Sequence, residues 1–343
     1  MNISFVPLSP TLYPAFYALV QSTQWGNPML PVAYNNSLWG MLVQDSSETI
    51  VGGWVGTLRG NAPLVRCIAK SVYFDSYPVF CSPEDEVQYL PRLMEVVKQY
   101  ARRQHIVMLN LTHWVRGNCS IFLDKVTPCA TFYYDLSLSM ESLYNQLDRL
   151  KKRTIKKAEA NQLDVQFFAG KEAIPYIPQF QALRKETQQR AIEHNQNASM
   201  LLKSDTFFER LFATNKTTLA VVRTQDGKIV AAATFIESGA TVYAHMSGSD
   251  AEANRTTGSG TYYYWKAVEY FRGKDLKQFD FGGCPVEPSE DDPAFGVFMF
   301  KRGFGGTYLS AREGQVIISK QKYRLLNFLL SQRKLLRLLS KRL

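Results

Sequence analysis

The stretch from Met246 to Gly260 reads Met-Ser-Gly-Ser-Asp-Ala-Glu-Ala-Asn-Arg-Thr-Thr-Gly-Ser-Gly, and the aromatic segment Thr-Tyr-Tyr-Tyr-Trp follows it. The spacing of apolar residues after this stretch predicts a helix over residues 260–273. Glycines ahead of a helix let backbone N–H groups approach an anion, and the helix dipole adds positive potential. Arg255, Gly258 and Gly260 are therefore a candidate anion-binding turn, with Arg255 as a bidentate clamp. The alternative is a loop whose glycines only serve turns.

Segments with the character of strands precede this turn and follow its helix. A strand meander comes first, in which Gln225-Asp-Gly-Lys indicates a hairpin because Asp-Gly tolerates positive φ. A buried strand follows the helix, and two more strands are expected before the C-terminal segment. This order predicts an α/β fold built around a mixed sheet. The expected strands are residues 218–224, 228–237, 240–246, 278–281 and two within 303–319.

The first half of the chain has the same alternation. Its expected strands are residues 38–43, 49–57, 106–111 and 133–136, and its expected helix is 84–103, in which Pro91 is a possible kink. After it we expect helices at 142–161, 174–195 and 207–214, and a strand at 164–168. The chain length favours two domains. We place them at residues 1–147 and 148–319, followed by a C-terminal helix at 320–343.

The composition excludes several classes of protein. Among 343 residues, 21 Phe, 18 Tyr and 5 Trp provide ample core material, which excludes a mostly disordered chain. No apolar run is long enough for a membrane-spanning helix, and the N-terminus does not resemble a secretory signal. The 5 cysteines and 4 histidines show no metal-ligand spacing. We therefore expect a soluble cytoplasmic protein with reduced thiols, no metal and no tightly bound cofactor.

The positive charge is concentrated in two segments. The net charge is +10, but residues 148–160 hold six bases against two acids, and residues 320–343 hold eight bases and no acid. The remainder of the chain is close to neutral. Such segments are either solvated helix faces or a surface for phosphates, on a nucleic acid, a nucleotide-linked substrate or an anionic bilayer.

The C-terminal segment has the pattern of a basic amphipathic helix. At about 100° per residue, its apolar residues fall on one face and several of its bases on the opposite face. Such a helix either docks on its own protein's core or lies on a membrane surface or a partner. The apolar face comprises Leu325, Phe328, Leu329, Leu335, Leu336, Leu339 and Leu343.

The glycine turn resembles the pyrophosphate-binding turn of the GNAT acyltransferase superfamily, Arg/Gln-x-x-Gly-x-Gly/Ala. A more specific resemblance lies downstream. Phe279-Asp-Phe-Gly-Gly283 and Gly296-Val-Phe-Met-Phe-Lys-Arg-Gly-Phe-Gly-Gly306 are similar to the C-terminal signature of the Fem family. The Fem proteins are peptidoglycan aminoacyltransferases built from two GNAT-like domains. The resemblance implies two tandem GNAT-like domains here, with the C-terminal helix packing back on the first.

Further segments resemble the same family over nearly the whole chain. They include the junction around Arg153-x-Ile-Lys-Lys-Ala-Glu159 and the substrate-binding helix around Phe180-x-x-Leu-x-x-x-Thr187-x-x-Arg190. The first domain departs from the family: the lysine expected soon after Trp25 is absent, and Asn110-Leu-Thr-His113 replaces an acidic residue. These departures put the usual nucleotide-linked muropeptide acceptor in doubt and leave acyl transfer in place.

The resemblance implies a site in the second domain. Lys301 is the candidate for stabilising the oxyanion that forms when an amine attacks an ester or thioester. Arg190 is the candidate for gripping an acceptor phosphate, and His245 for removing the proton of the amine. Asp280 and Phe304 belong to the proposed substrate-binding set, although Asp280 also suits a structural role as the cap of its glycine turn. Each lysine, arginine or histidine could instead be an ordinary surface or core residue.

The expected reaction transfers an aminoacyl or acyl group from an activated donor to an amine of a cell-envelope or peptidoglycan precursor. Two donors remain open. Aminoacyl-tRNA suits the basic segments, and acyl-CoA or an acyl carrier suits the glycine turn. The non-enzyme alternative is a degenerate Fem-like or GNAT-like binding protein at the inner membrane face, held there by residues 320–343.

Overall fold

A computed structural model describes residues 3–33, 37–60, 66–112, 121–193 and 202–339, with side chains to residue 332 in the last range. By contact the chain divides into two compact units. Unit 1 comprises residues 1–23, 33–127 and 312–343, and unit 2 comprises residues 24–32 and 128–311. Residues 128–147, expected from the sequence in the first domain, belong to unit 2.

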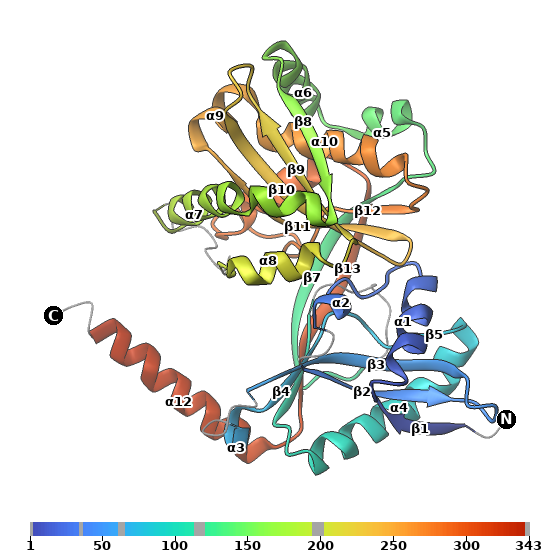
Figure 1. Cartoon of the computed structure of the whole chain (residues 1–343). Helices are drawn as coiled ribbons and strands as arrows, with labels where there is room; N and C mark the ends of the chain where they lie inside the picture. Colours follow the sequence, from blue (N-terminus) through green and yellow to red (C-terminus); the bar gives the residue numbers. More distant parts are fainter. Residues whose placement is uncertain (1–2, 34–36, 61–65, 113–120, 194–201, 340–343) are drawn as a thin grey trace. The chain divides into compact units, whose positions relative to one another are not determined.

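Unit 1 is a mixed sheet with helices packed on it (Figure 1). Its strand order is β1-β2-β3-β4-β6-β13, in which β4 and β6 pair in parallel and β5 adds to β3. Indole and phenyl rings of Trp54 and Phe74 stack at 3.7 Å in its core. The elements are β1 (Ser4–Pro7), α1 (Tyr13–Ser22), β2 (Leu38–Gln44), β3 (Ile50–Arg59), α3 (Arg66–Ala69), β4 (Ser71–Phe74), β5 (Val79–Phe80), α4 (Pro83–Arg103), β6 (Met108–Leu111) and α12 (Lys320–Leu339).

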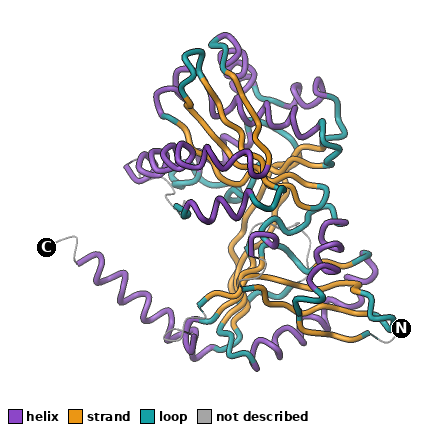
Figure 2. The backbone as a smooth tube through the Cα atoms, viewed as in Figure 1, coloured by secondary structure: helices purple, strands orange, loops and turns teal. Residues whose placement is uncertain are grey.

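Unit 2 has the strand order β7-β12-β11-β10-β9-β8, and helices cover both faces (Figure 2). β7 (Lys125–Asp135) and β13 (Thr307–Ile317) contribute residues to both units. The other strands are β8 (Asp164–Ala169), β9 (Thr217–Arg223), β10 (Ile229–Ser238), β11 (Thr241–Ser249) and β12 (Gln278–Asp280).

Two apolar cores lie on the two faces of this sheet. One contains residues of α5, α6, α10 and α11, and the other contains residues of a 3-10 helix, α7 and α8. α2 lies at the second core through Val32. The helices are α2 (Leu30–Ala33), α5 (Met140–Gln146), α6 (Arg149–Ala160), the 3-10 helix (Gly170–Tyr176), α7 (Ile177–Glu193), α8 (Asp205–Phe212), α9 (Ala251–Thr257), α10 (Ser259–Arg272) and α11 (Phe295–Arg302).

The mixed α/β fold, the meander and its hairpin are confirmed, and three local predictions are wrong. The helix expected at 142–161 is two helices, because the Asp148 carboxylate accepts the Lys151 N–H at 2.6 Å and starts a new helix. The two strands expected within 303–319 are the single strand β13, and the expected short strand 133–136 is the end of β7. α9 lies before Gly258, in a segment for which the sequence predicted neither helix nor strand. α4 continues through Pro91, and Asn195 lies outside the described residues.

The C-terminal helix α12 belongs to unit 1 and contacts α3, as the family resemblance implied. Its apolar face is nevertheless largely exposed within the described side chains. Among the helices that the structure describes, none has both the length and the apolar character that crossing a lipid bilayer requires.

Candidate active site

The candidate site lies where two parallel strands of unit 2 separate. β11 and β12 pair over three residues, and the last pair is Tyr243 with Asp280. β11 continues against β10 as far as Ser249, whereas the chain after β12 turns at Gly282, which has φ of +80°. Ligands of open α/β sheets bind outside the carboxyl ends of strands, where neighbouring strands diverge. The separation of β11 and β12 is such a place.

Asp280, the last residue of β12, holds the turn that follows the strand through buried hydrogen bonds. Its side chain is buried, and Oδ1 accepts hydrogen bonds from Thr131 Oγ1 at 2.5 Å and from the Gly282 N–H at 2.6 Å. Thr131 belongs to β7, the strand on the other side of β12. The carboxylate therefore fixes the glycine turn to the neighbouring strand, in agreement with the structural role considered for it.

Lys301 reaches this turn from α11. The residue is 8% exposed, and its Nζ donates a hydrogen bond of 2.7 Å to the Gly283 carbonyl. A Cβ at Gly282 would stand 3.3 Å from that Nζ and 3.0 Å from the Ala244 carbonyl of β11. A side chain at Gly282 would therefore crowd both the Lys301 amine and the β11 backbone. Burial lowers the pKa of Lys301 to about 8, and the neighbouring Cys284 and Asp280 oppose the shift. Lys301 remains mostly a cation at neutral pH.

Among the described groups, Cys284 is the thiol that interacts electrostatically with Lys301. It is buried, and its Sγ donates to the Ala130 carbonyl at 3.4 Å. Burial raises the pKa of the thiol to about 11 despite the positive charge of Lys301. Because the thiolate is the nucleophilic form, Cys284 is unsuited to carry an acyl group covalently.

His245 follows Ala244 on β11 but lies on the α7–α8 side of the sheet. Its Nδ1 is 3.4 Å from Thr234 Oγ1 of β10, and its ring centroid is 6.5 Å from that of Phe207 in α8. The α11 side chain Phe300 instead packs on Tyr264 of α10, with centroids 5.5 Å apart. The His245 ring thus packs on one face of the sheet, whereas α11, which carries Lys301, packs on the other.

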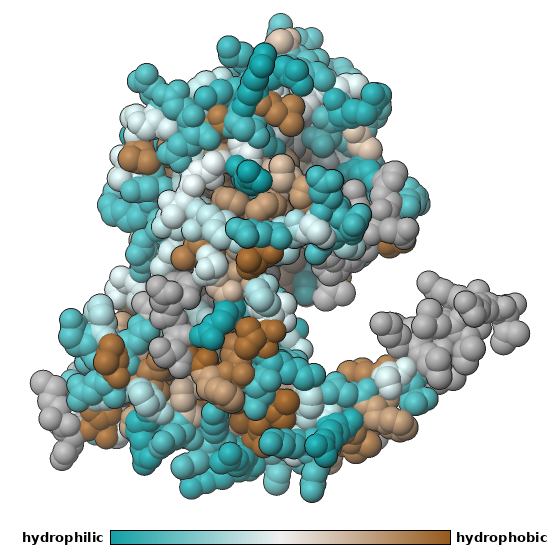
Figure 3. Space-filling model, turned by 180° about the vertical axis from the view of Figure 1, so that it is seen from behind, coloured by the Kyte–Doolittle hydropathy of each residue, from teal (hydrophilic) through white to brown (hydrophobic). Residues whose placement is uncertain are grey.

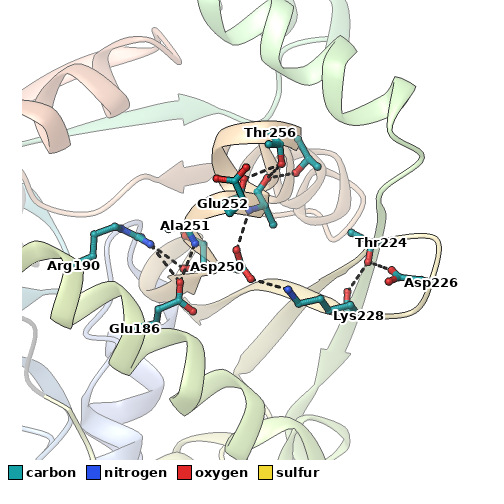
Figure 4. A network of polar contacts seen from close by, with 12 residues as sticks. Glu186, Arg190, Thr224, Asp226, Lys228, Asp250, Ala251, Glu252 and Thr256 are labelled. Atoms are coloured by element: carbon teal, nitrogen blue, oxygen red, sulfur yellow. Dashed lines mark hydrogen bonds and ion pairs between the residues drawn. The ribbon is translucent and has the colours of Figure 1, made fainter.

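Arg190 lies at the carboxyl end of β11. Its guanidinium donates to the Ser249 carbonyl at 3.4 Å and is 3.8 Å from Glu186 of the same helix. Glu186 in turn accepts the backbone N–H of Ala251 at 3.0 Å, so both side chains of α7 face the start of α9 (Figure 4). Arg190 is therefore held beside the strand end that leads to the glycine turn.

The glycine turn itself joins α9 to α10. Gly258 has φ of +78°, and a Cβ there would lie 2.3 Å from Thr154 Cγ2 of α6. The Gly260 N–H donates to Asn254 Oδ1 at 2.8 Å, and the Gly258 N–H donates to the Asn254 carbonyl at 2.9 Å. In this conformation both donors are used inside the protein. An anion here would have to displace the Asn254 amide.

Arg255 forms an ion pair on the surface of α9. Its side chain is 74% exposed and forms an ion pair with Glu252 at 2.7 Å. The pair joins neighbouring turns of α9, and Glu252 is labelled with the surrounding network in Figure 4. The turn thus shows a packing role for its glycines, and its role in donor binding stays a prediction.

Lys151, which from the sequence was expected only as part of a basic segment, is a buried lysine. It is 5% exposed, and its Nζ lies 3.5 Å from the ring centroid of Phe300 and 4.6 Å from that of Phe304. Burial lowers the pKa of this lysine to about 7, against the opposing charge of Asp148. The sequence did contain a signal for this burial: Lys151 has helical spacing to Ile155 and Ala158, which lie on the buried face of α6.

Phe304 is a core residue in this structure. It is fully buried, its ring stacks on Phe281 at 4.8 Å, and its carbonyl accepts a short hydrogen bond from the Tyr134 hydroxyl. It therefore supports Lys151 and the end of β12. Its proposed contact with substrate remains a prediction.

A groove of about 820 Å³ in unit 2 is lined in part by residues of α11. Its lining includes an aromatic cluster, in which the Phe132 ring is 5.1 Å from Tyr308 and 5.8 Å from Phe298. Lys301 is not part of its wall. The lining residues are Phe132, Glu287, Pro288, Ser289, Glu290, Phe295, Phe298, Met299, Arg302 and Tyr308. Within the described residues, no three His, Cys, Asp or Glu side chains gather as a metal site.

Comparison with known proteins bears on the domain and on the fold. Residues 146–302 match the family model of the acetyltransferase (GNAT) domain. A search by sequence among curated proteins found no significant match. The fold is similar to the crystal structure of FemX, with a TM-score of 0.69, 12% identity, and coverage of 93% of this chain and 99% of that one.

Two other solved structures share the fold. L-PGS from Bacillus licheniformis has a TM-score of 0.58 and 9% identity, covering 89% of this chain and 91% of its own. A tandem GNAT protein from the clavulanic acid biosynthesis pathway has a TM-score of 0.50 and 13% identity, covering 93% of this chain and 99% of its own. The fold is thus that of tandem GNAT proteins.

Proposed function

We propose that this acyltransferase, whose residues 146–302 match the GNAT domain model, transfers an aminoacyl or acyl group to an amine of a cell-envelope precursor. The observation that carries the proposal is the Lys301 ammonium, buried at the point where β11 and β12 separate. The likeness to FemX supports it at the level of the fold.

In the proposed reaction the nitrogen of the acceptor adds to the carbonyl carbon of the donor ester or thioester. The carbonyl oxygen takes up the electron pair and becomes an oxyanion, and the nitrogen loses a proton to a base. His245 is the base expected from the sequence; because its ring packs on the α7–α8 face of the sheet and Lys301 comes from α11 on the other face, this role stays a prediction. Collapse of the tetrahedral intermediate re-forms the carbonyl and breaks the bond to the leaving oxygen or sulfur, which then takes up a proton.

Lys301 is suited to the oxyanion because its environment is fixed in advance. One N–H is held by the Gly283 carbonyl, and an ammonium has two further donors. Because the amine is buried, its charge interacts more strongly with developing negative charge than it would in water. A single preorganised donor of this kind contributes roughly 10²–10³ in rate.

Aminoacyl-tRNA is the donor that the surface of unit 2 favours. Arg149, Arg153, Lys156 and Lys157 of α6 are exposed, so they are available to phosphates. The N–H groups of Gly258 and Gly260 are already used, which weakens the case for the pyrophosphate of acyl-CoA. Acyl-CoA remains the second candidate because the Arg-x-x-Gly-x-Gly pattern is present.

The test is mass spectrometry of candidate amines after incubation with the protein and either charged tRNA or acyl-CoA. We expect a transferred mass with one donor, and a loss of roughly 10²–10³ in rate for Lys301→Ala without loss of donor binding. Lys216→Ala, an exposed lysine of the same unit, is the matched control. Turnover that survives Lys301→Ala would remove this lysine from the mechanism. Donor binding without any transfer would favour the non-catalytic alternative.

A further inference from the structure

The C-terminal helix α12 is anchored to unit 1 through one side of its first turn. Tyr323 is buried, its hydroxyl donates to Gln315 Oε1 of β13 at 2.7 Å, and the Lys125 ammonium lies 4.9 Å from its ring centroid. Gln315 also donates to Asn110 Oδ1 of β6 at 3.0 Å. The start of the helix therefore has a defined position on the sheet of unit 1.

The opposite side of α12 is apolar and exposed. Leu325, Phe328 and Leu329 are 46%, 59% and 40% exposed. At roughly 100° per residue they lie about 140–240° around the helix from Tyr323, so the anchor does not cover them. Figure 3 shows hydrophobic surface on the part of α12 that precedes its grey end. We call Leu325, Phe328 and Leu329 the apolar sector.

Basic residues border the apolar sector. Lys322 and Arg324 flank Tyr323 in sequence and so lie roughly 100° to either side of it, at the two edges of the sector. From Lys320 to the C-terminus the chain carries eight bases and no acid. Long basic side chains can extend their charges outward while their stems cover apolar surface.

We propose that α12 lies on an anionic lipid surface, with its apolar sector in the headgroup–acyl boundary and its bases against lipid phosphates. A membrane satisfies both features of the helix at once. A nucleic acid would neutralise the bases but leave exposed leucine and phenylalanine in water. A second copy of α12 would bring two strongly basic segments together. The lipid surface would hold the enzyme next to envelope substrates, but the proposal does not depend on the proposed reaction.

The experiment is flotation of the full chain with phosphatidylcholine vesicles, with and without phosphatidylglycerol. We expect binding only to the vesicles that contain phosphatidylglycerol, weakened by added salt. The double variant Phe328→Ser with Leu329→Gln should reduce partitioning by about tenfold or more. Leu330→Gln is the matched control, because Leu330 is 51% exposed but lies outside the apolar sector.

Equal thermal melting of the variants and the parent would show that they are folded, as expected for changes at exposed positions. Replacing Lys322 and Arg324 by Gln should lower binding to the phosphatidylglycerol vesicles without restoring binding to pure phosphatidylcholine. Absence of vesicle binding by the parent chain would overturn the proposal. Vesicle binding that the double variant leaves unchanged would also overturn it. Binding of the parent chain to tRNA but not to vesicles would do the same.

Discussion

The Asp280 carboxylate of β12 and the Thr131 hydroxyl of β7 share a hydrogen bond of 2.5 Å across adjacent strands. The same carboxylate oxygen accepts the Gly282 N–H, and the next residue, Gly283, holds the amine of Lys301. A buried acid in one strand is thus linked through the glycine turn to a cation from α11. This relationship makes Asp280 a positioning residue whose effect can be measured without a substrate.

Asp280→Asn should lower the pKa of Lys301 below its value of about 8, because the negative charge of Asp280 favours the ammonium form. NMR titration of isotope-labelled lysine, with Lys301→Arg to assign the signal, measures the change. Thr131→Val is the control, since it removes the hydrogen bond and keeps the charge. An unchanged pKa in Asp280→Asn would show that the carboxylate does not act on Lys301 electrostatically.

Burial of Lys151 should make stability depend on pH. Its pKa is about 7 in the folded chain, whereas a free lysine side chain has a pKa of 10.5, so the unfolded chain binds more protons between these values. Stability should therefore rise with pH from about 7 toward 10, as the cost of burying the cation is relieved. Lys301 contributes with the same sign.

Lys151→Met keeps much of the side-chain volume and removes the charge. We expect it to stabilise the chain at pH near 7 and to reduce the gain in stability on going to pH near 9. Urea unfolding at both pH values measures this, with Lys152→Met, a less buried neighbour, as the control. A parallel loss of stability at both pH values would mean that the contacts of the ammonium with Phe300 and Phe304 outweigh the cost of burial.

Sequence patterns predicted what depends on local chemistry. The Asp-Gly hairpin, the meander and the buried strand before Gly282 follow from turn residues and apolar spacing. The sequence patterns did not predict that Asn254 Oδ1 would accept a hydrogen bond from the Gly260 N–H, because that bond depends on how α9 folds back on the turn. The burial of Lys151 depends likewise on Phe300 and Phe304, far away in sequence.

Gly258→Ala tests the packing role of the glycine turn. Gly227 is the matched control, because it has a similar φ of +83° and a Cβ there would meet nothing within 4 Å, whereas a Cβ at Gly258 would meet Thr154 at 2.3 Å. Backbone strain at either site costs of the order of 1–2 kcal/mol. We expect Gly258→Ala to destabilise the chain beyond Gly227→Ala in chemical denaturation. Equal losses would show that Thr154 yields without cost.

The exposed bases of α6 provide a test of the donor. Arg153→Gln and Lys156→Gln should weaken tRNA binding and lower the dependence of log Kd on log salt concentration by roughly 0.7–0.9 for each phosphate that is no longer neutralised. The reason is that each neutralised phosphate releases counterions from the nucleic acid. Lys274→Gln is the control, since this lysine of the same unit is paired with Glu237 at 2.9 Å. A salt dependence that neither α6 variant changes would place the nucleic acid elsewhere, and competition by free pantetheine compounds would instead favour the acyl-CoA donor.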